Sequence, residues 1–149
     1  FQATHAPQLE NAVRQADVIS CATLSKEPII KGEWLKKGVH LDLIGSHLPT
    51  TREVDDLAIQ SGRIFVDARS GAPHETGELF IPISKGVIQE SAIQGDMVDL
   101  CMRKNIGRIN EEENTIFKSA GLAIEDLAVA LLLYKVLRSS DFDQQGGRK

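Results

Sequence analysis

The 149-residue chain carries a formal net charge of -4 and is 42% hydrophobic and 26% charged, which is typical of a folded globular domain. The acidic balance argues against a nucleic-acid partner, because binding to a phosphate backbone requires clustered Lys and Arg. Cys21 and Cys101 lack the spacing of a zinc site, so we expect no metal and a cytoplasmic location. No apolar run approaches the roughly 20 residues that cross a bilayer, so we expect no membrane partner.

Helix and strand patterns alternate through the first half of the chain. Residues 9–16 have the apolar spacing of a short helix, and residues 17–23 form a nearly continuous apolar and β-branched run, which predicts a strand buried on both faces. A helix at 30–37, a strand at 39–44, a helix at 53–61 and a strand at 63–67 are expected next. Thr50 and Glu53 have the spacing of a capping box at the second of these helices.

The second half is less regular. Glycines and prolines in residues 70–114 predict turns and short helices, one of them near residues 97–104. A short strand is expected at 115–118, followed by a helix at 122–137 that is apolar almost all round and should therefore be buried. Residues 139–149 are expected to be a disordered tail. Together with the first half, these elements predict an α/β fold, a Rossmann-type parallel sheet with flanking helices over residues 1–138.

Three loops follow predicted strands of this sheet. In open parallel sheets, ligands bind beyond the carboxyl ends of the strands. Any one such loop is more often a plain connection than a site, but three together favour a ligand site. The loops are Thr23-Leu24-Ser25, Gly45-Ser46-His47 and Ser119-Ala120-Gly121.

The chemistry of these loops suggests individual roles. His47 is a candidate proton donor or acceptor, since imidazole titrates near neutral pH. The small residues at 119–121 precede a helix, where backbone amides can receive a ligand carboxylate, and Lys118 adds a possible charge. The alternative interpretation of this loop is a tight turn at Gly121 beside a solvated lysine. The chain contains no GxGxxG motif to hold a dinucleotide pyrophosphate, and it does not begin with Met.

Several sequence runs, in this order and spacing, resemble the ornithine cyclodeaminase and mu-crystallin family up to about Tyr134. They are ADVI with ATLS at 16–19 and 22–25, EWLKKGVH at 33–40, IGSHLP with REVDD at 44–49 and 52–56, and IFKSAGLAIEDLA at 116–128.

The resemblance implies a nicotinamide-binding Rossmann-type domain from the carboxyl-terminal half of an enzyme. In that family, NAD or NADP exchanges hydride with small amino acids or cyclic imino acids, and homo-oligomers are expected. By position, the resemblance implies cofactor contacts at Thr23, Leu24, Ser25, Gly45, Ser46, Lys118 and Ser119, and substrate contacts at Ala120 and Gly121. The glycine-rich turn, the catalytic lysine and the substrate-binding arginine of the family would belong to an amino-terminal half that this chain lacks.

The resemblance also bears on which reaction to expect. Cyclodeaminases of the family carry a catalytic aspartate where this chain has His47. The sequence therefore favours reduction of a cyclic imino acid of the delta1-pyrroline-2-carboxylate type over cyclisation of ornithine. Ornithine cyclodeaminase, and a domain without catalytic activity of its own, are the alternatives.

Overall fold

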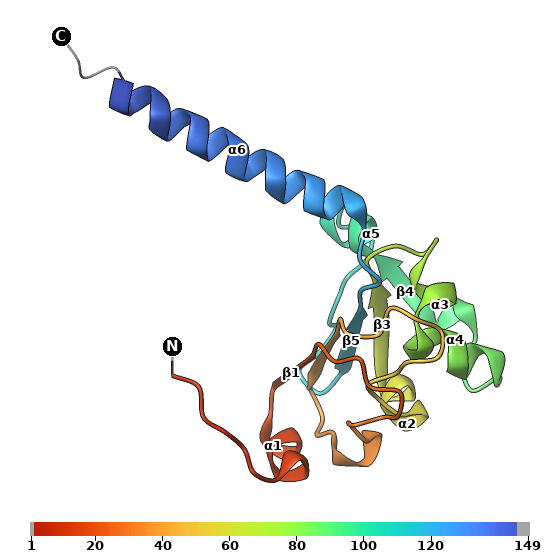
Figure 1. Ribbon diagram of the computed structural model, residues 1–149. Coiled ribbons are helices and arrows are strands. Elements are labelled where there is room, and N and C mark those ends of the chain that lie inside the picture. Colours follow the sequence, from red (N-terminus) through yellow and green to blue (C-terminus); the bar gives the residue numbers. More distant parts are fainter. Residues whose placement is uncertain (1, 146–149) are drawn as a thin grey trace.

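A computed structural model of the chain describes residues 2–145, and the side chains of residues 2–138. Its centre is a five-stranded sheet in which all paired strands are parallel, in the order β1-β2-β5-β3-β4 (Figure 1). The strands are β1 Val18–Cys21, β2 His40–Leu43, β3 Gly62–Val66, β4 Ile93–Asp96 and β5 Asn114–Lys118. The predicted α/β fold with a parallel sheet and flanking helices is confirmed.

Short helices connect the strands. They are α1 Leu9–Gln15, η1 Gly32–Trp34, α2 Asp56–Gln60, α3 Ala72–Glu75, α4 Gly77–Ser84, η2 Glu90–Ala92 and α5 Met97–Cys101, and α6 Ala123–Gln145 follows the last strand. The predicted helix at 30–37 is limited to the single turn of η1. The backbone next to it turns at Gly38, whose φ of 78° lies in the left-handed region that glycine adopts readily.

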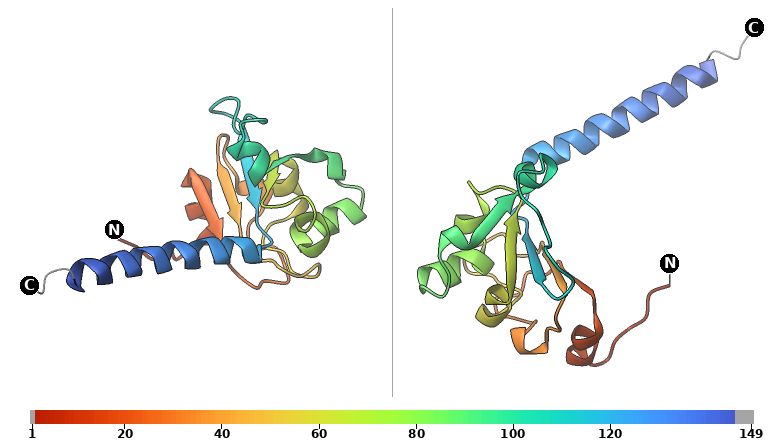
Figure 2. Two further views of the ribbon diagram at one scale, coloured as in Figure 1. Left: turned by 90° about the horizontal axis from the view of Figure 1, so that it is seen from above. Right: turned by 180° about the vertical axis from the view of Figure 1, so that it is seen from behind.

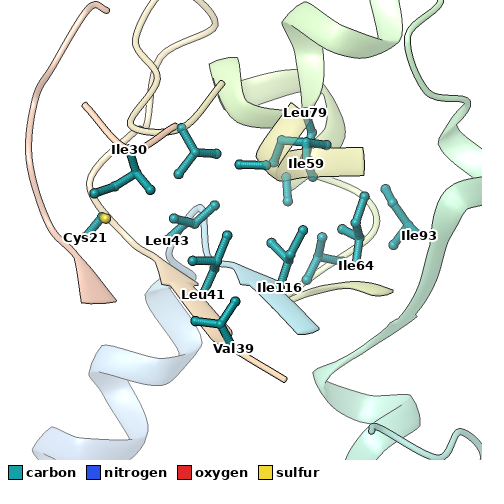
Figure 3. Packing of buried hydrophobic residues seen from close by; sticks show 14 of the residues in the cluster. Cys21, Ile30, Val39, Leu41, Leu43, Ile59, Ile64, Leu79, Ile93 and Ile116 are labelled. Carbon is teal, nitrogen blue, oxygen red and sulfur yellow. The ribbon is translucent and has the colours of Figure 1, made fainter. Parts of the chain in front are cut away.

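The hydrophobic core lies on one face of the sheet. Figure 3 shows Leu41, Leu43 and Ile116 from the strands pointing toward Ile59 of α2 and Leu79 of α4. All five side chains are fully buried. At about 1.5–3 kcal/mol for each buried aliphatic side chain, this contact holds α2 and α4 against the middle of the sheet.

Three details differ from the sequence prediction. β1 is an edge strand, and Val18 is 63% exposed rather than buried on both faces. A continuous apolar run does not reveal on which side neighbours are present, so the prediction was wrong. β4 was not predicted, because its sequence, IQGD, has little strand character. The cap of α2 is Asp55, whose carboxylate accepts from the Ala58 amide, and not the predicted Thr50 and Glu53 pair.

The long helix α6 is not buried. It extends away from the sheet in every view, and each described side chain from residue 123 to 138 is exposed (Figures 1 and 2). Apolar residues on all sides made burial the expected state, but that pattern does not identify the surface that would cover the helix. The helix backbone continues to Gln145, beyond the expected end near residue 137. Of the tail expected at 139–149, residues 146–149 lie outside the described residues.

None of the helices in the described part of the chain combines the length and the apolar character that a membrane span requires.

Candidate functional site

The three predicted loops lie at one edge of the sheet. β1, β2 and β5 are neighbouring parallel strands, so their carboxyl ends point the same way. The Ser119 amide donates to the Leu43 carbonyl over 3.1 Å, which ties the loop after β5 to the end of β2. A side-chain carbon at Gly45 would overlap the Thr23 backbone, so the loops after β1 and β2 touch there. The close approach requires glycine at position 45.

Glu53 joins the loops after β1 and β2. Its side chain is fully buried, and one carboxylate oxygen accepts from the Thr23 amide at 2.5 Å while the other accepts from the Gly45 amide at 2.9 Å. Hydrogen bonds to an ionised acceptor are roughly twice as strong as neutral ones. A single buried carboxylate therefore sets the spacing of these two loops.

Glu53 belongs to a buried charged cluster with Glu78 and Lys118. The Glu78 carboxylate accepts from the Glu53 amide, and Lys118 Nζ lies 3.8 Å from a Glu78 oxygen. Nζ also donates to the Leu43 carbonyl over 3.0 Å. Burial lowers the pKa of Lys118, while the negative charges of Glu78 and Glu53 oppose that shift. All three side chains are fully buried, so the cluster acts from beneath the loops.

Asp67 holds the loop after β5. It follows β3 directly, is 3% exposed, and its Oδ2 accepts from the Ala120 and Gly121 amides at 2.7 Å each. The same oxygen accepts from the Ser119 hydroxyl at 3.1 Å. The backbone donors that were expected to face a ligand carboxylate are therefore bound to a carboxylate of the chain itself. That expectation is wrong for the amides of residues 120 and 121.

His47 lies on the exposed part of the site. Its Nδ1 is 3.2 Å from the Gly45 carbonyl. A carbonyl oxygen can only accept, so Nδ1 carries the proton in this contact and Nε2 is the acceptor of the neutral ring. Leu24, Ile44 and Leu48 are 70%, 49% and 48% exposed, which gives the same edge an apolar surface.

The structure divides the predicted site residues into two groups. Ser46 and Lys118 are fully buried, so their side chains do not reach the loop surface where a ligand contact was expected. Ser46 Oγ instead donates to the Thr51 carbonyl at 2.5 Å and accepts from the Gly77 amide at 3.2 Å, which folds the loop after β2 onto α4. The other predicted residues lie at the edge with some or full exposure: Thr23, Leu24, Ser25, Gly45, His47, Ser119, Ala120 and Gly121.

Sequence reasoning missed Glu53, Glu78 and Asp67. The available signal for Asp67 was its position, an acid directly after a strand whose carboxyl end faces the site. Glu53 was assigned to a helix cap, and nothing in the local sequence distinguishes a capping glutamate from a buried one. Among the described residues, no group of three His, Cys, Asp or Glu is placed to hold a metal ion.

Comparison with known proteins identifies the family. Residues 1–141 match the model of the ornithine cyclodeaminase/mu-crystallin family. A delta(1)-pyrroline-2-carboxylate reductase of Paracoccus denitrificans is 39% identical over 129 residues, which are 87% of this chain and 41% of that protein.

Two solved structures have the same fold at 34% identity. The delta(1)-pyrroline-2-carboxylate reductase of Thermococcus litoralis, in complex with NADH and L-proline, matches with a TM-score of 0.84 over 87% of this chain and 40% of its own. An archaeal alanine dehydrogenase dimer with bound NAD matches with a TM-score of 0.82 over 90% and 41%. This chain therefore spans about two fifths of the length of these relatives. Because the family model matches residues 1–141, the chain belongs to the ornithine cyclodeaminase/mu-crystallin family.

Proposed function

We propose that this chain forms part of an NAD(P)H-dependent reductase that acts on a small cyclic imino acid of the delta1-pyrroline-2-carboxylate type. The observation that carries the proposal is the meeting of three loops at the carboxyl edge of β1, β2 and β5. Support also comes from the Thermococcus litoralis relative, which is described with NADH and L-proline, the reduced form of such an imino acid. We further propose that the protein is a cytoplasmic homo-oligomer.

The edge fits one part of a nicotinamide cofactor better than the other. Leu24, Ile44 and Leu48 offer exposed apolar surface for a flat ring. A pyrophosphate needs several free backbone amides, usually from a glycine-rich turn. Here the amides of Ala120 and Gly121 are bound to the protein itself, so this edge fits the ring and not the pyrophosphate.

The exposed loop residues then have distinct tasks. We assign Thr23, Leu24, Ser25, Gly45 and Ser119 to contacts with the cofactor, and Ala120 and Gly121 to contacts with the substrate. A bound nicotinamide cofactor would supply the hydride that the imine carbon takes up, and the imine nitrogen would then gain a proton. His47 is our candidate for that proton transfer, because its Nδ1 contact with Gly45 fixes the ring and leaves Nε2 to exchange a proton.

Steady-state kinetics of the full-length protein test the proposal. We expect oxidation of NADH or NADPH with pyrroline-2-carboxylate and no ammonia release from ornithine. If ornithine is cyclised and the imino acid is not reduced, the cyclodeaminase alternative replaces this one. His47→Gln should lower kcat about a hundredfold. His74→Gln, at an exposed histidine of α3, is the control and should leave kcat unchanged.

Calorimetric titration of the 149-residue chain with NADH and NADPH addresses the alternative of a domain without activity of its own. Because the amides of Ala120 and Gly121 are bound to Asp67 and the chain has no GxGxxG turn to hold a pyrophosphate, we expect binding weaker than about 10 μM, or about -7 kcal/mol. Tighter binding would mean that the chain holds the dinucleotide by itself.

A further inference from the structure

We infer that Asp67 is a positioning residue that sets the loop at 119–121 and thereby the place of the imino acid. The catalytic part of this inference depends on the proposed function. Its structural part does not, since it concerns hydrogen bonds within the chain. Asp67 touches no position where a ligand would react, because its side chain is 3% exposed beneath the loop.

Asp67 is itself held rigidly at the sheet edge. Its amide donates to the Lys118 carbonyl at 3.2 Å, which extends the pairing of β3 with β5 by one residue. Its Oδ1 accepts from the Ala68 amide at 2.7 Å, which fixes the rotation of the carboxylate. The second oxygen, Oδ2, is thereby directed at residues 119–121, where it accepts its three hydrogen bonds.

The loop needs this carboxylate because its own backbone cannot satisfy its donors. Gly121 has a φ of 87°, so the chain turns sharply between β5 and α6 and leaves two successive amides pointing the same way. Such paired amides form an anion-binding nest. In this protein the nest is filled by Asp67, and the filled nest locks the turn.

A consequence for the substrate follows. An imino acid at this loop cannot place its carboxylate on the amides of Ala120 and Gly121, since both are occupied and the negative charge of Asp67 lies next to them. The loop can therefore limit the position of the substrate by steric contact, but it does not offer a binding site for the substrate carboxylate. We expect the substrate carboxylate to be bound by other groups, with Asp67 controlling how close the ring comes.

Hydrogen exchange and kinetics of the Asp67→Asn variant test the inference. Asparagine keeps the size of the side chain but loses the charge and replaces one acceptor oxygen by a donor. We expect exchange at the Ala120 and Gly121 amides to speed up about tenfold or more, KM for the imino acid to rise about tenfold, and KM for NADH to change less than twofold.

The matched control is Asp55→Asn. Asp55 also accepts two backbone amides, from Gly32 at 2.9 Å and Ala58 at 2.8 Å, but it lies at the start of α2. This variant should lose comparable stability while leaving exchange at residues 120 and 121 and both KM values unchanged. Equal effects of the two variants on KM would reduce Asp67 to a general stabilising residue and overturn the inference.

The remaining outcomes are also decisive. If Asp67→Asn does not fold, exchange in the unmodified protein decides. Gly121 is an exposed residue, so the inference requires its amide, which donates to Asp67, to exchange at least about tenfold more slowly than in an unstructured peptide. If the unmodified protein does not reduce imino acids, the proposed function fails and the exchange data alone judge the role of Asp67. Faster exchange with an unchanged imino-acid KM would overturn the positioning role.

Discussion

Replacing Glu53 with glutamine should destabilise the protein by about 3 kcal/mol. Glutamine can still accept one of the two amides, from Thr23 or Gly45, but its NH2 group then faces the other amide, which is left unsatisfied. The loss of a hydrogen bond to a buried charged acceptor costs about 1.5–3 kcal/mol, and an unsatisfied buried donor adds to this. Neutralising Glu53 also removes repulsion from Glu78, but Lys118 already offsets that repulsion, so the hydrogen bonds decide the sign.

Urea unfolding measures the effect. With an m value of roughly 2 kcal/mol per M, a loss of about 3 kcal/mol lowers the midpoint by about 1.5 M. Glu75→Gln is the matched control, because Glu75 lies exposed on α3, and surface changes of this kind stay within about 0.5 kcal/mol. A Glu53→Gln variant as stable as the control would refute the idea that this carboxylate joins the two loops.

Three further predictions concern groups outside the loops. Burial raises the pKa of the Cys21 thiol to about 12, so a thiol reagent at pH 8 should label exposed Cys101 quickly and Cys21 only after unfolding; rapid labelling of both would contradict this burial. Burial lowers the pKa of His40 below 6.5, so the unfolded chain binds more protons than the folded chain below pH 6.5, and the free energy of unfolding should fall as the pH drops from 6.5 toward the folded pKa. Urea titrations at several pH values measure this slope, and His40→Gln should remove it. The exposed apolar surface of α6 should make the 149-residue chain self-associate as its concentration rises, and Leu132→Glu should weaken that association in sedimentation experiments. A chain that stays monomeric at all concentrations would contradict this prediction.

The α/β class and four of the five strands could be predicted from the sequence, because most of these strands leave local signals. The alternation of helix and strand patterns, with a stop at Gly38 before β2, identified the α/β class without any knowledge of packing. The exposed side of β1 and the bare surface of α6 could not be predicted. Both depend on which neighbour is present, and an apolar side chain has the same sequence signature whether or not another element covers it.

The candidate site, like the fold, could be predicted only in part. The positions of the three loops followed from the rule that ligand sites gather at the carboxyl ends of parallel strands. The residues that hold the loops did not follow, because Glu53 and Asp67 act on amides that are distant in sequence. Lys118 illustrates the limit: its position beside the 119–121 loop suggested a ligand contact, yet its side chain points from β5 into the core. Alternation along a strand decides such a case only when the buried face is known.

The most direct test of the central claim is the initial rate of NADH and NADPH oxidation by the full-length protein with pyrroline-2-carboxylate, measured beside ammonia release from ornithine. We predict saturable oxidation of at least one cofactor with the imino acid and no ammonia from ornithine. Ammonia release without reduction of the imino acid would contradict the assignment of this loop edge to imine reduction.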